Sequence, residues 1–442
     1  MAAAEAHAQR RTRFLEAMAE DGIAILPAAP ERHRNGDVFY PYRQDSDFWY
    51  LTGFPEPEAI CVLSRTAEAT YTLFVRPRDK EREIWDGKRA GVEGAKARFG
   101  ADAAYTIDTF EEKLPELLKG HDHVYYRLGH HERLDALLQQ TLESLRARNR
   151  DGAKVPSAIV DPGTILWEMR LHKGPEEIET LRRVCALTAE GHRSAMAFAR
   201  PQLTERDVQA AIEYVFRRRG AQAVGYPSIV AGGANATILH YVENDAPLRA
   251  GDLLLIDAGA ELDGYSADIT RTFPVSGRFE GPQRDLYEVV LAAQEAAIES
   301  VRPGTRFIAP HETAVRVLTE GLVDLGLLAG EVDALIEDEK YKRFFMHKTG
   351  HWLGLDVHDV GRYFEGDGSS RTFEPGMVTT IEPGLYVAED DPEAPEAFRG
   401  IGVRIEDDVL VTEAGNEVLT QDAPKAPDEV ESACQAEVQL PL

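Results

Sequence analysis

The chain has 442 residues, of which 43% are hydrophobic and 28% are charged, as in ordinary folded proteins with two or three domains. Its 76 acidic and 49 basic residues give a formal net charge of −27, which argues against a nucleic-acid partner because phosphates need a basic surface. No apolar run suits a signal peptide or a membrane span. The three cysteines (Cys61, Cys185 and Cys434) are widely separated, which favours a reducing compartment. We therefore expect a cytoplasmic protein that binds neither membranes nor nucleic acid.

The first part of the chain, 1–172, predicts an α/β domain. Residues 10–20 have the pattern of a short amphipathic helix. Short β-rich runs follow, among them 22–26 and 70–75, separated by Pro, Gly, Asn and Asp. A second helical pattern covers 131–149, close to the expected end of this domain.

The second expected domain, 173–442, begins with a break at Lys173-Gly-Pro175 and continues as a long helical pattern. Pro175 suits the first position of that helix, where its missing N–H costs nothing. At the other end, the acidic and Pro-rich segment from about residue 423 is expected to pack lightly or fray.

An internal repeat runs through this second domain. The segments 251–259 and 376–384 both read Gly, five residues, an acid, one residue, Gly. Each half has helices followed by strands, and each places a carboxylate at the end of a β-rich run, Asp257 in the first and Glu382 in the second. Two such halves facing each other predict an α+β domain with a pseudo-two-fold repeat and one site at the interface of the halves.

A hairpin brings a second acid close to Asp257. The dipeptide Asp263-Gly264 is a strong two-residue turn signal between a buried-type run and a strand predicted over 265–273. With that turn, Asp268 lies opposite Gly259, so Asp257 and Asp268 are diagonal neighbours on one face with about 7–8 Å between their α-carbons. Two acids aimed at one point repel each other unless a cation lies between them.

The second half of the repeat supplies two further acids. Glu382 follows a β-rich run, and alternation along 402–406 places Arg404 and Glu406 on one face and apolar residues on the other. Glu406 can therefore reach a polar site with Arg404 as its charged neighbour.

Histidines gather in the segment 346–361, which contains His347, His351 and His358, and His240 is an isolated further candidate. The i, i+4 spacing of His347 and His351 resembles the zinc-binding HExxH motif. The general-base Glu of that motif is missing, however, and a glycine between the two histidines weakens a helix, so we do not favour this alternative.

Four carboxylates and one imidazole suit two divalent metal ions, because four negative charges balance two dications and bridging carboxylates can hold ions about 3.5–4 Å apart. Oxygen-rich ligation with a single nitrogen favours Mn²⁺ over a structural zinc, although Co²⁺, Fe²⁺ or Zn²⁺ could occupy the same ligands.

At these residues the chain resembles the Xaa-Pro aminopeptidases (aminopeptidase P), which share a superfamily with prolidase and methionine aminopeptidase and have a catalytic domain of the pita-bread fold. The likeness covers nearly the whole chain. It is carried by the segments 257–273, 351–361, 381–384 and 403–407 and, in the amino-terminal half, by 42–53 and 83–85.

The resemblance implies that Asp257 binds one metal ion, that His351 and Glu382 bind the other, and that Asp268 and Glu406 bridge both. It assigns the remaining positions as follows: His240, His347 and His358 along the substrate pocket, Arg404 and Tyr386 near the site, and Trp85 at the site of a neighbouring subunit. The last assignment fits a homodimer or homotetramer, which the family also suggests.

The resemblance implies hydrolysis of the bond between an amino-terminal residue and a following proline. A hydroxide bridging the two metal ions would attack, Glu382 would carry the proton, and His358 or His240 would stabilise the oxyanion. A prolidase, which cleaves only Xaa-Pro dipeptides with the same ligands, is the nearest alternative. A pita-bread domain that only binds a protein partner is a remote one, since such a domain has no need of a complete ligand set.

Overall fold

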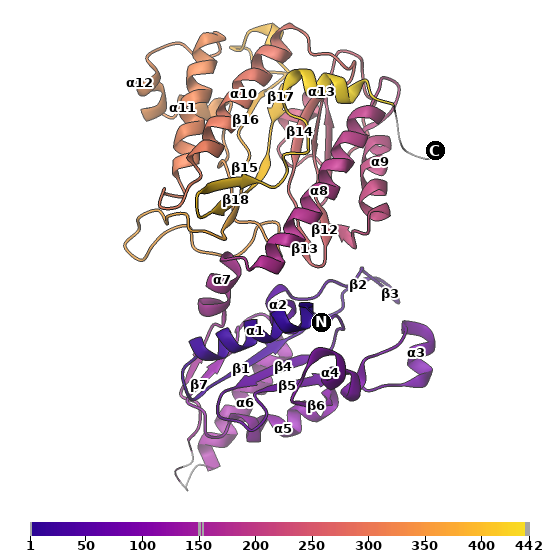
Figure 1. Ribbon diagram of the computed structural model, residues 1–442, viewed down its shortest axis with the longest axis vertical. Coiled ribbons are helices and arrows are strands. Elements are labelled where there is room, and N and C mark those ends of the chain that lie inside the picture. Colours follow the sequence, from indigo (N-terminus) through magenta and orange to yellow (C-terminus); the bar gives the residue numbers. More distant parts are fainter. Residues whose placement is uncertain (1, 149–151, 153, 438–442) are drawn as a thin grey trace. The chain divides into compact units, whose positions relative to one another are not determined.

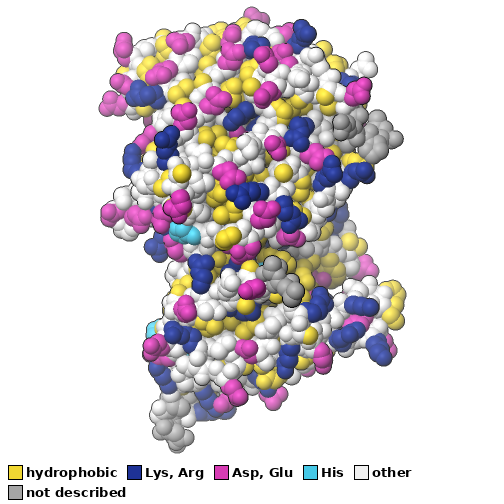
Figure 2. All heavy atoms as spheres, viewed as in Figure 1, with side chains coloured by type: hydrophobic (Ala, Val, Ile, Leu, Met, Phe, Trp, Pro, Cys, Tyr) yellow, Lys and Arg dark blue, Asp and Glu magenta, His cyan; other side chains and the backbone are white. Residues whose placement is uncertain are grey.

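The computed structural model describes residues 2–148, 152 and 154–437, and the chain divides into two compact units, Met1–Arg170 and Leu171–Leu442 (Figure 1). The division falls at residue 170, against the limit at 172 expected from the sequence. Within the described part of the chain, none of the helices has the length and apolar character needed to cross a membrane. Figure 2 shows acidic and basic side chains interspersed over the visible face, without a continuous basic patch among the described residues there.

The N-terminal unit is built on one six-stranded sheet with the strand order β6-β5-β4-β1-β7-β8. A separate hairpin, β2–β3, lies outside this sheet. The strands are β1 Gly22–Pro27, β2 His33–Asn35, β3 Val38–Phe39, β4 Ile60–Ser64, β5 Tyr71–Val75, β6 Ala103–Thr106, β7 His123–Tyr125 and β8 Ala158–Val160. The helices are α1 Ala2–Ala17, α2 Ser46–Thr52, α3 Lys80–Asp86, α4 Gly91–Phe99, α5 Phe110–Leu118, α6 Glu132–Arg148 and α7 Gly163–Leu171.

The sheet of this unit is mixed, because β1 pairs antiparallel with β4 and parallel with β7. Helices α5 and α6 bury Leu114 and Leu138 against Ile23 and Phe74 of the sheet, and this apolar cluster forms the core of the unit. The unit is therefore the α/β domain that the sequence predicts.

The predicted runs 22–26 and 70–75 are confirmed as β1 and β5, and the helix predicted over 131–149 is α6, with residue 149 outside the described residues. The limits 10–20 of the first helix were wrong, because α1 covers Ala2–Ala17. Alanine is the strongest helix former, so the alanine-rich start extends the helix beyond its amphipathic part.

The C-terminal unit, as far as residue 437, contains four small sheets with helices around them (Figure 1). The sheets have the orders β10-β11-β14, β13-β12-β9, β15-β18-β19 and β16-β17. The helices are α8 Pro175–Phe198, α9 Glu205–Arg218, α10 Gly281–Ser300, α11 Ala309–Asp324, α12 Val332–Glu337 and α13 Pro427–Cys434. The strands are β9 Ala223–Val224, β10 Ile229–Gly232, β11 Leu253–Asp257, β12 Ala260–Leu262, β13 Tyr265–Ser266, β14 Thr270–Pro274, β15 Val378–Ile381, β16 Gly384–Val387, β17 Ile401–Arg404, β18 Asp407–Thr412 and β19 Gly415–Val418.

The hairpin predicted around Asp263-Gly264 is confirmed, together with its register. Leu262 pairs with Tyr265 in one sheet, and Asp257 pairs with Thr270 in the next, so both pairs keep the register set by the turn. The continuous strand expected over 265–273 was wrong, because β13 and β14 are separate and belong to different sheets.

The gap between β13 and β14 contains Asp268 and is crossed very closely by Gly259. A β-carbon on Gly259 would lie 1.7 Å from the carbonyl oxygen of Ala267. Only glycine permits this approach. Asp268 lies outside both strands, and its N–H donates to Asp408 Oδ2 at 3.0 Å.

The expectation that the chain packs lightly from residue 423 was wrong for residues 423–434. The carbonyl groups of Ala423 and Pro424 accept hydrogen bonds from the buried guanidinium of Arg271, and Val430 of α13 is fully buried. Composition alone did not reveal this, because the bonds are made by backbone carbonyls.

Candidate active site

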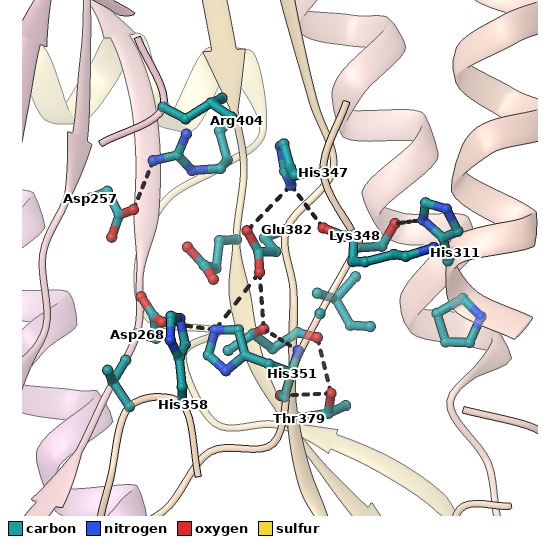
Figure 3. A pocket seen from close by; sticks show the side chains of 18 of the residues that line it. Asp257, Asp268, His311, His347, Lys348, His351, His358, Thr379, Glu382 and Arg404 are labelled. Atoms are coloured by element: carbon teal, nitrogen blue, oxygen red, sulfur yellow. Dashed lines mark hydrogen bonds and ion pairs between the residues drawn. The ribbon is translucent and has the colours of Figure 1, made fainter. Parts of the chain in front are cut away.

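A cavity of about 860 Å³ opens in the C-terminal unit, where the acids expected from the repeat come together. Asp257 ends β11, Asp268 lies between β13 and β14, Glu382 follows β15 and Glu406 follows β17. All four line the cavity, and so does His351. The structure therefore collects the whole predicted ligand set from segments up to about 150 residues apart. Figure 3 labels Asp257, Asp268, His351 and Glu382 of this set.

Asp257 and Asp268 face one point and share a hydroxyl group there. The Tyr226 hydroxyl lies 2.6 Å from Asp257 Oδ1 and 2.5 Å from Asp268 Oδ1. A phenol has one proton, so it can donate to only one of the two carboxylates at a time. Tyr226 was not among the predicted site residues, because it lies on a loop before β10 and no local pattern marks it.

Glu382 and Glu406 lie in surroundings that favour their neutral forms, although the positive charge of Arg404 acts on both. Burial raises the pKa of Glu382 to about 7, and it raises the pKa of Glu406 well above its usual range. Glu406 Oε2 accepts a hydrogen bond of 2.6 Å from the Thr270 hydroxyl, which sequence reasoning also missed. Burial likewise raises the pKa of Asp268, so the anionic form of each of these three acids is unfavourable without added positive charge.

His351 lies among these acids. Its Nε2 is 3.4 Å from Asp268 Oδ2 and 3.8 Å from Glu382 Oε1, while its Nδ1 bonds to the Trp352 carbonyl at 3.0 Å. Burial opposes protonation of this ring, but the Asp268 and Glu382 carboxylates outweigh it and raise the pKa of His351 to about 9.

The donor set fits a divalent metal ion. Asp268, His351 and Glu406 each offer a ligand atom, and these atoms all lie within 4.8 Å of one another. Oxygen and imidazole ligands suit first-row divalent ions, and the surplus of negative charge in the cluster suits a dication. The segment that carries His347 and His351 is not helical, so the HExxH alternative has no support in the structure.

Arg404 orients the first acid and links it to a second group of side chains. Its Nη2 donates to Asp257 Oδ2 at 2.7 Å and its Nη1 to the Tyr386 hydroxyl at 3.0 Å. That hydroxyl lies 2.9 Å from His347 Nε2, and His347 Nδ1 lies 3.7 Å from Glu382 Oε2. Tyr386, which the resemblance places near the site, is only 2% exposed, and its hydroxyl bonds to both Arg404 and His347.

His240 and His358 line the same cavity and are exposed to solvent. The ring of His358 meets that of His351 edge to face, with 4.3 Å between the ring centroids. Burial lowers the pKa of His358, so the ring is neutral at pH 7 and can donate one hydrogen bond.

Trp85 is not among the residues that line the cavity. It lies on α3 of the N-terminal unit, where its side chain is 85% exposed and that of Ile84 is 80% exposed. The cavity is lined by residues of the C-terminal unit, among them two that sequence reasoning did not consider, His311 and Lys348.

Comparison with known proteins finds relatives for both parts of the chain. The chain matches the model of metallopeptidase family M24 over residues 179–413 and that of the aminopeptidase P N-terminal domain over residues 7–125. An Xaa-Pro aminopeptidase of Escherichia coli is 46% identical over 426 residues, which cover 96% of each chain.

Solved structures agree with these matches. An aminopeptidase of Pseudomonas aeruginosa, PepP, superposes with a TM-score of 0.96 at 50% identity, and zinc-substituted E. coli aminopeptidase P in complex with product does so with 0.94 at 45% identity. Each comparison covers 98% of both chains. The predicted fold, an α/β N-terminal domain followed by an α+β pita-bread domain, is confirmed.

Proposed function

The chain belongs to metallopeptidase family M24 and is therefore a metal-dependent peptidase; we propose that it hydrolyses the bond between an amino-terminal residue and a following proline. The observation that supports this most directly is the group of four carboxylates and one histidine at the cavity, three of whose acids are destabilised as anions by burial. Its high-identity relative in E. coli is named for the same activity.

We extend the proposal to two divalent metal ions, with Mn²⁺ as the preferred one. Asp257 would bind one ion, His351 and Glu382 the other, and Asp268 and Glu406 would bind both. Four carboxylates balance two dications, and the tight group of ligand atoms at Asp268, His351 and Glu406 supports bridging positions for the two acids. Oxygen ligands with one imidazole favour Mn²⁺.

When bound here, divalent ions lower the pKa of a water molecule and polarise the peptide carbonyl. Glu382, whose carboxylate lies at the cavity, would take up and release the proton. His358 and His240, exposed on the cavity wall, donate hydrogen bonds to the carbonyl oxygen as charge develops on it. Arg404 keeps Asp257 oriented, and Tyr386 keeps His347 oriented.

The cavity also suits the residues on both sides of the bond to be cleaved. The free amine of a substrate would be held by a bound metal ion or a nearby carboxylate, and such binding would require an unblocked amino terminus. Apolar side chains such as Phe307, Ile308 and Phe373 line the remaining wall and can pack against a proline ring. A proline nitrogen has no N–H to donate, so an apolar wall is sufficient there.

The test is a metal-dependent assay of the full-length protein on Xaa-Pro dipeptides, Xaa-Pro-Xaa tripeptides and longer peptides, with Xaa-Ala-Xaa as a control. We expect hydrolysis of the tripeptides and longer peptides only when proline is second, and its loss after chelation. Hydrolysis of dipeptides alone would favour a prolidase, and full activity without metal would contradict the proposal.

We further propose that the protein is a cytoplasmic homodimer or homotetramer. The three cysteines are free, and Cys61 and Cys185 are buried thiols, which is consistent with a reducing compartment. The exposed Ile84 and Trp85 on α3 support an association surface on the N-terminal unit. Light scattering of the wild type and of Trp85→Ala tests this: a wild-type monomer, or an unchanged oligomer in the variant, would contradict the role of α3.

A further inference from the structure

We propose that Lys348 binds the terminal carboxylate of short peptide substrates, and that it thereby makes the enzyme selective for peptides that end inside or just beyond the cavity. The inference rests on the proposed function and specifies the substrate class of the same site. It concerns a side chain that neither the ligand set nor the proton transfer uses.

Charge is segregated along the cavity. Asp257 and Asp268 lie on one side, Lys348 and His311 lie on the other, and Glu382 lies between the two pairs (Figure 3). A short peptide has its positive charge at one end and its negative charge at the other. Such a cavity therefore suits a peptide whose amine lies at the acids and the metal ions that they would hold, and whose carboxylate lies toward Lys348.

The ammonium group of Lys348 is available for a ligand. The other strong cation at the cavity, Arg404, is paired with Asp257 at 2.7 Å. Among the residues that the structure describes, no carboxylate forms an ion pair with Lys348, whose side chain is exposed. A lysine that is exposed at a cavity and lacks an internal partner can bind an external anion without first breaking a contact.

The neighbour of Lys348 on this side is a neutral ring. His311 Nδ1 bonds to the Thr349 hydroxyl at 2.8 Å. Burial lowers the pKa of His311 to about 4, and the positive charges of Lys348 and Lys342 contribute to this. At pH 7 His311 therefore adds no charge, and Lys348 supplies the positive charge on this wall.

The backbone that carries Lys348 is fixed next to the acid group. The Thr349 carbonyl accepts a hydrogen bond of 2.8 Å from the Glu382 N–H, and the Lys348 carbonyl lies 2.7 Å from His347 Nδ1. A β-carbon on Gly350 would lie 2.0 Å from the Thr380 carbonyl oxygen, so this segment packs directly on β15. The backbone of Lys348 is therefore held in place, and only its side chain needs to adjust to a ligand.

These contacts set the length of peptide that fits. The ring of His347, the residue before Lys348, is 3.7 Å from the Glu382 carboxylate, and adjacent α-carbons are about 3.8 Å apart. An extended peptide covers about 3.5 Å per residue. A peptide of three or four residues whose amine meets the acids therefore ends within reach of the four-carbon stem of Lys348.

The experiment compares Ala-Pro-Ala with its carboxyl-terminal amide, using the Mn²⁺-loaded full-length protein. We expect kcat/KM to be about 10-fold higher for the free acid, as for one charge-assisted hydrogen bond, with the difference mainly in KM. In Lys348→Met the ratio should fall to about 1. In the wild type it should also shrink as salt rises from about 0.05 M to about 0.5 M, because salt screens the pair.

Lys342→Met is the matched control. Lys342 is also an exposed lysine near His311, but it pairs with Glu339 at 2.6 Å and does not line the cavity. This variant should keep the wild-type ratio. If the ratio depended only on the total positive charge of the protein, Lys342→Met would lower it as much as Lys348→Met does.

A wild-type ratio of 1, or an unchanged ratio in Lys348→Met, would overturn the inference while leaving the peptidase proposal intact. If the wild type hydrolyses neither peptide with any divalent metal, the peptidase proposal fails instead. Calorimetric binding of the same two peptides then decides the inference: a preference for the acid that Lys348→Met removes supports it, and equal binding overturns it.

Discussion

Two neighbouring carboxylates, Glu406 and Asp407, are both buried, with exposed fractions of 2% and 0%, yet their surroundings are opposite. Burial alone would raise the pKa of Asp407, but Arg271 and Lys425 outweigh it and lower the pKa to about 2. Burial and the nearby acids, Asp268 first among them, instead raise the pKa of Glu406 well above its usual range.

The difference teaches how to distinguish a structural buried acid from a functional one. Asp407 accepts a hydrogen bond of 2.6 Å from Arg271 and one of 2.8 Å from Lys425, so the chain itself neutralises it. Glu406 accepts a hydrogen bond from a hydroxyl, and burial and acidic neighbours outweigh the pull of Arg404, which is itself paired with Asp257. A buried acid whose charge the cations of the chain do not balance therefore indicates a cation site.

The largest expected effect is on activity. Asp268→Ala should lower kcat/KM on a proline-second tripeptide by more than about 100-fold, because even residues that only support ligands cost 10- to 100-fold. The metal content of the purified variant, measured by mass spectrometry, should fall in parallel. Full activity of a metal-stripped preparation of this variant would refute the two-metal proposal.

The next effect is on stability and concerns Asp407, the compensated acid, which Arg271 and Lys425 neutralise. Arg271→Met should lower the free energy of unfolding of the metal-free protein by about 3–5 kcal/mol, because it leaves Asp407 charged and underpaired in the interior. Urea unfolding of the full-length protein measures this. Glu406→Gln, in the same metal-free state, should be neutral or stabilising, because burial and acidic neighbours make the charge of Glu406 unfavourable. Equal destabilisation by both variants would abolish the distinction between Asp407 and Glu406.

Stabilisation of the protein by metal should depend on the acid group that contains Asp268 and little on Asp407. Mn²⁺ at about 100 times its dissociation constant should stabilise the wild type by about 3 kcal/mol, seen as a higher Tm in calorimetry. We expect Asp268→Asn to lose most of this increase and Asp407→Asn to keep it. The reverse pattern would place the metal at the compensated acid.

The smallest effect is the pH dependence of the stability that Asp407, the compensated acid, contributes. Its folded pKa of about 2 lies below the ordinary 3.8, so the stability that it contributes is present above about pH 4 and is lost as pH falls toward about 2. The loss should be on the order of 2 kcal/mol. Urea unfolding at pH 4 and pH 3 should show a steeper decline in the wild type than in Asp407→Asn, and parallel declines would contradict the low pKa.

Much of the site could be predicted because it depends on local turn and strand signals and on the internal repeat. The turn at Asp263-Gly264 fixes a register that persists to Asp257 and Thr270, since strand pairing leaves one choice once the turn is set. The repeat then identifies Glu382 as the counterpart of Asp257, and both lie at the cavity. The family resemblance supplied the choice of His351 among the histidines, which spacing alone left open.

Other parts could not be predicted, because they depend on contacts between distant segments. Tyr226 reaches two acids from a loop without a sequence pattern, and the buried Tyr386 hydroxyl bonds to Arg404 and His347. The tail beyond residue 423 seemed loosely packed, yet Lys425 neutralises Asp407.

The sequence by itself determined the fold class, the hairpin register and the set of acids, because these follow from periodicity, turn chemistry and an internal repeat. Only the tertiary structure decided which of the adjacent Glu406 and Asp407 is compensated. The reason is physical: the pKa of a buried carboxyl depends on which charges surround it in space, and Arg271 and Lys425 come from segments that no local pattern connects to it.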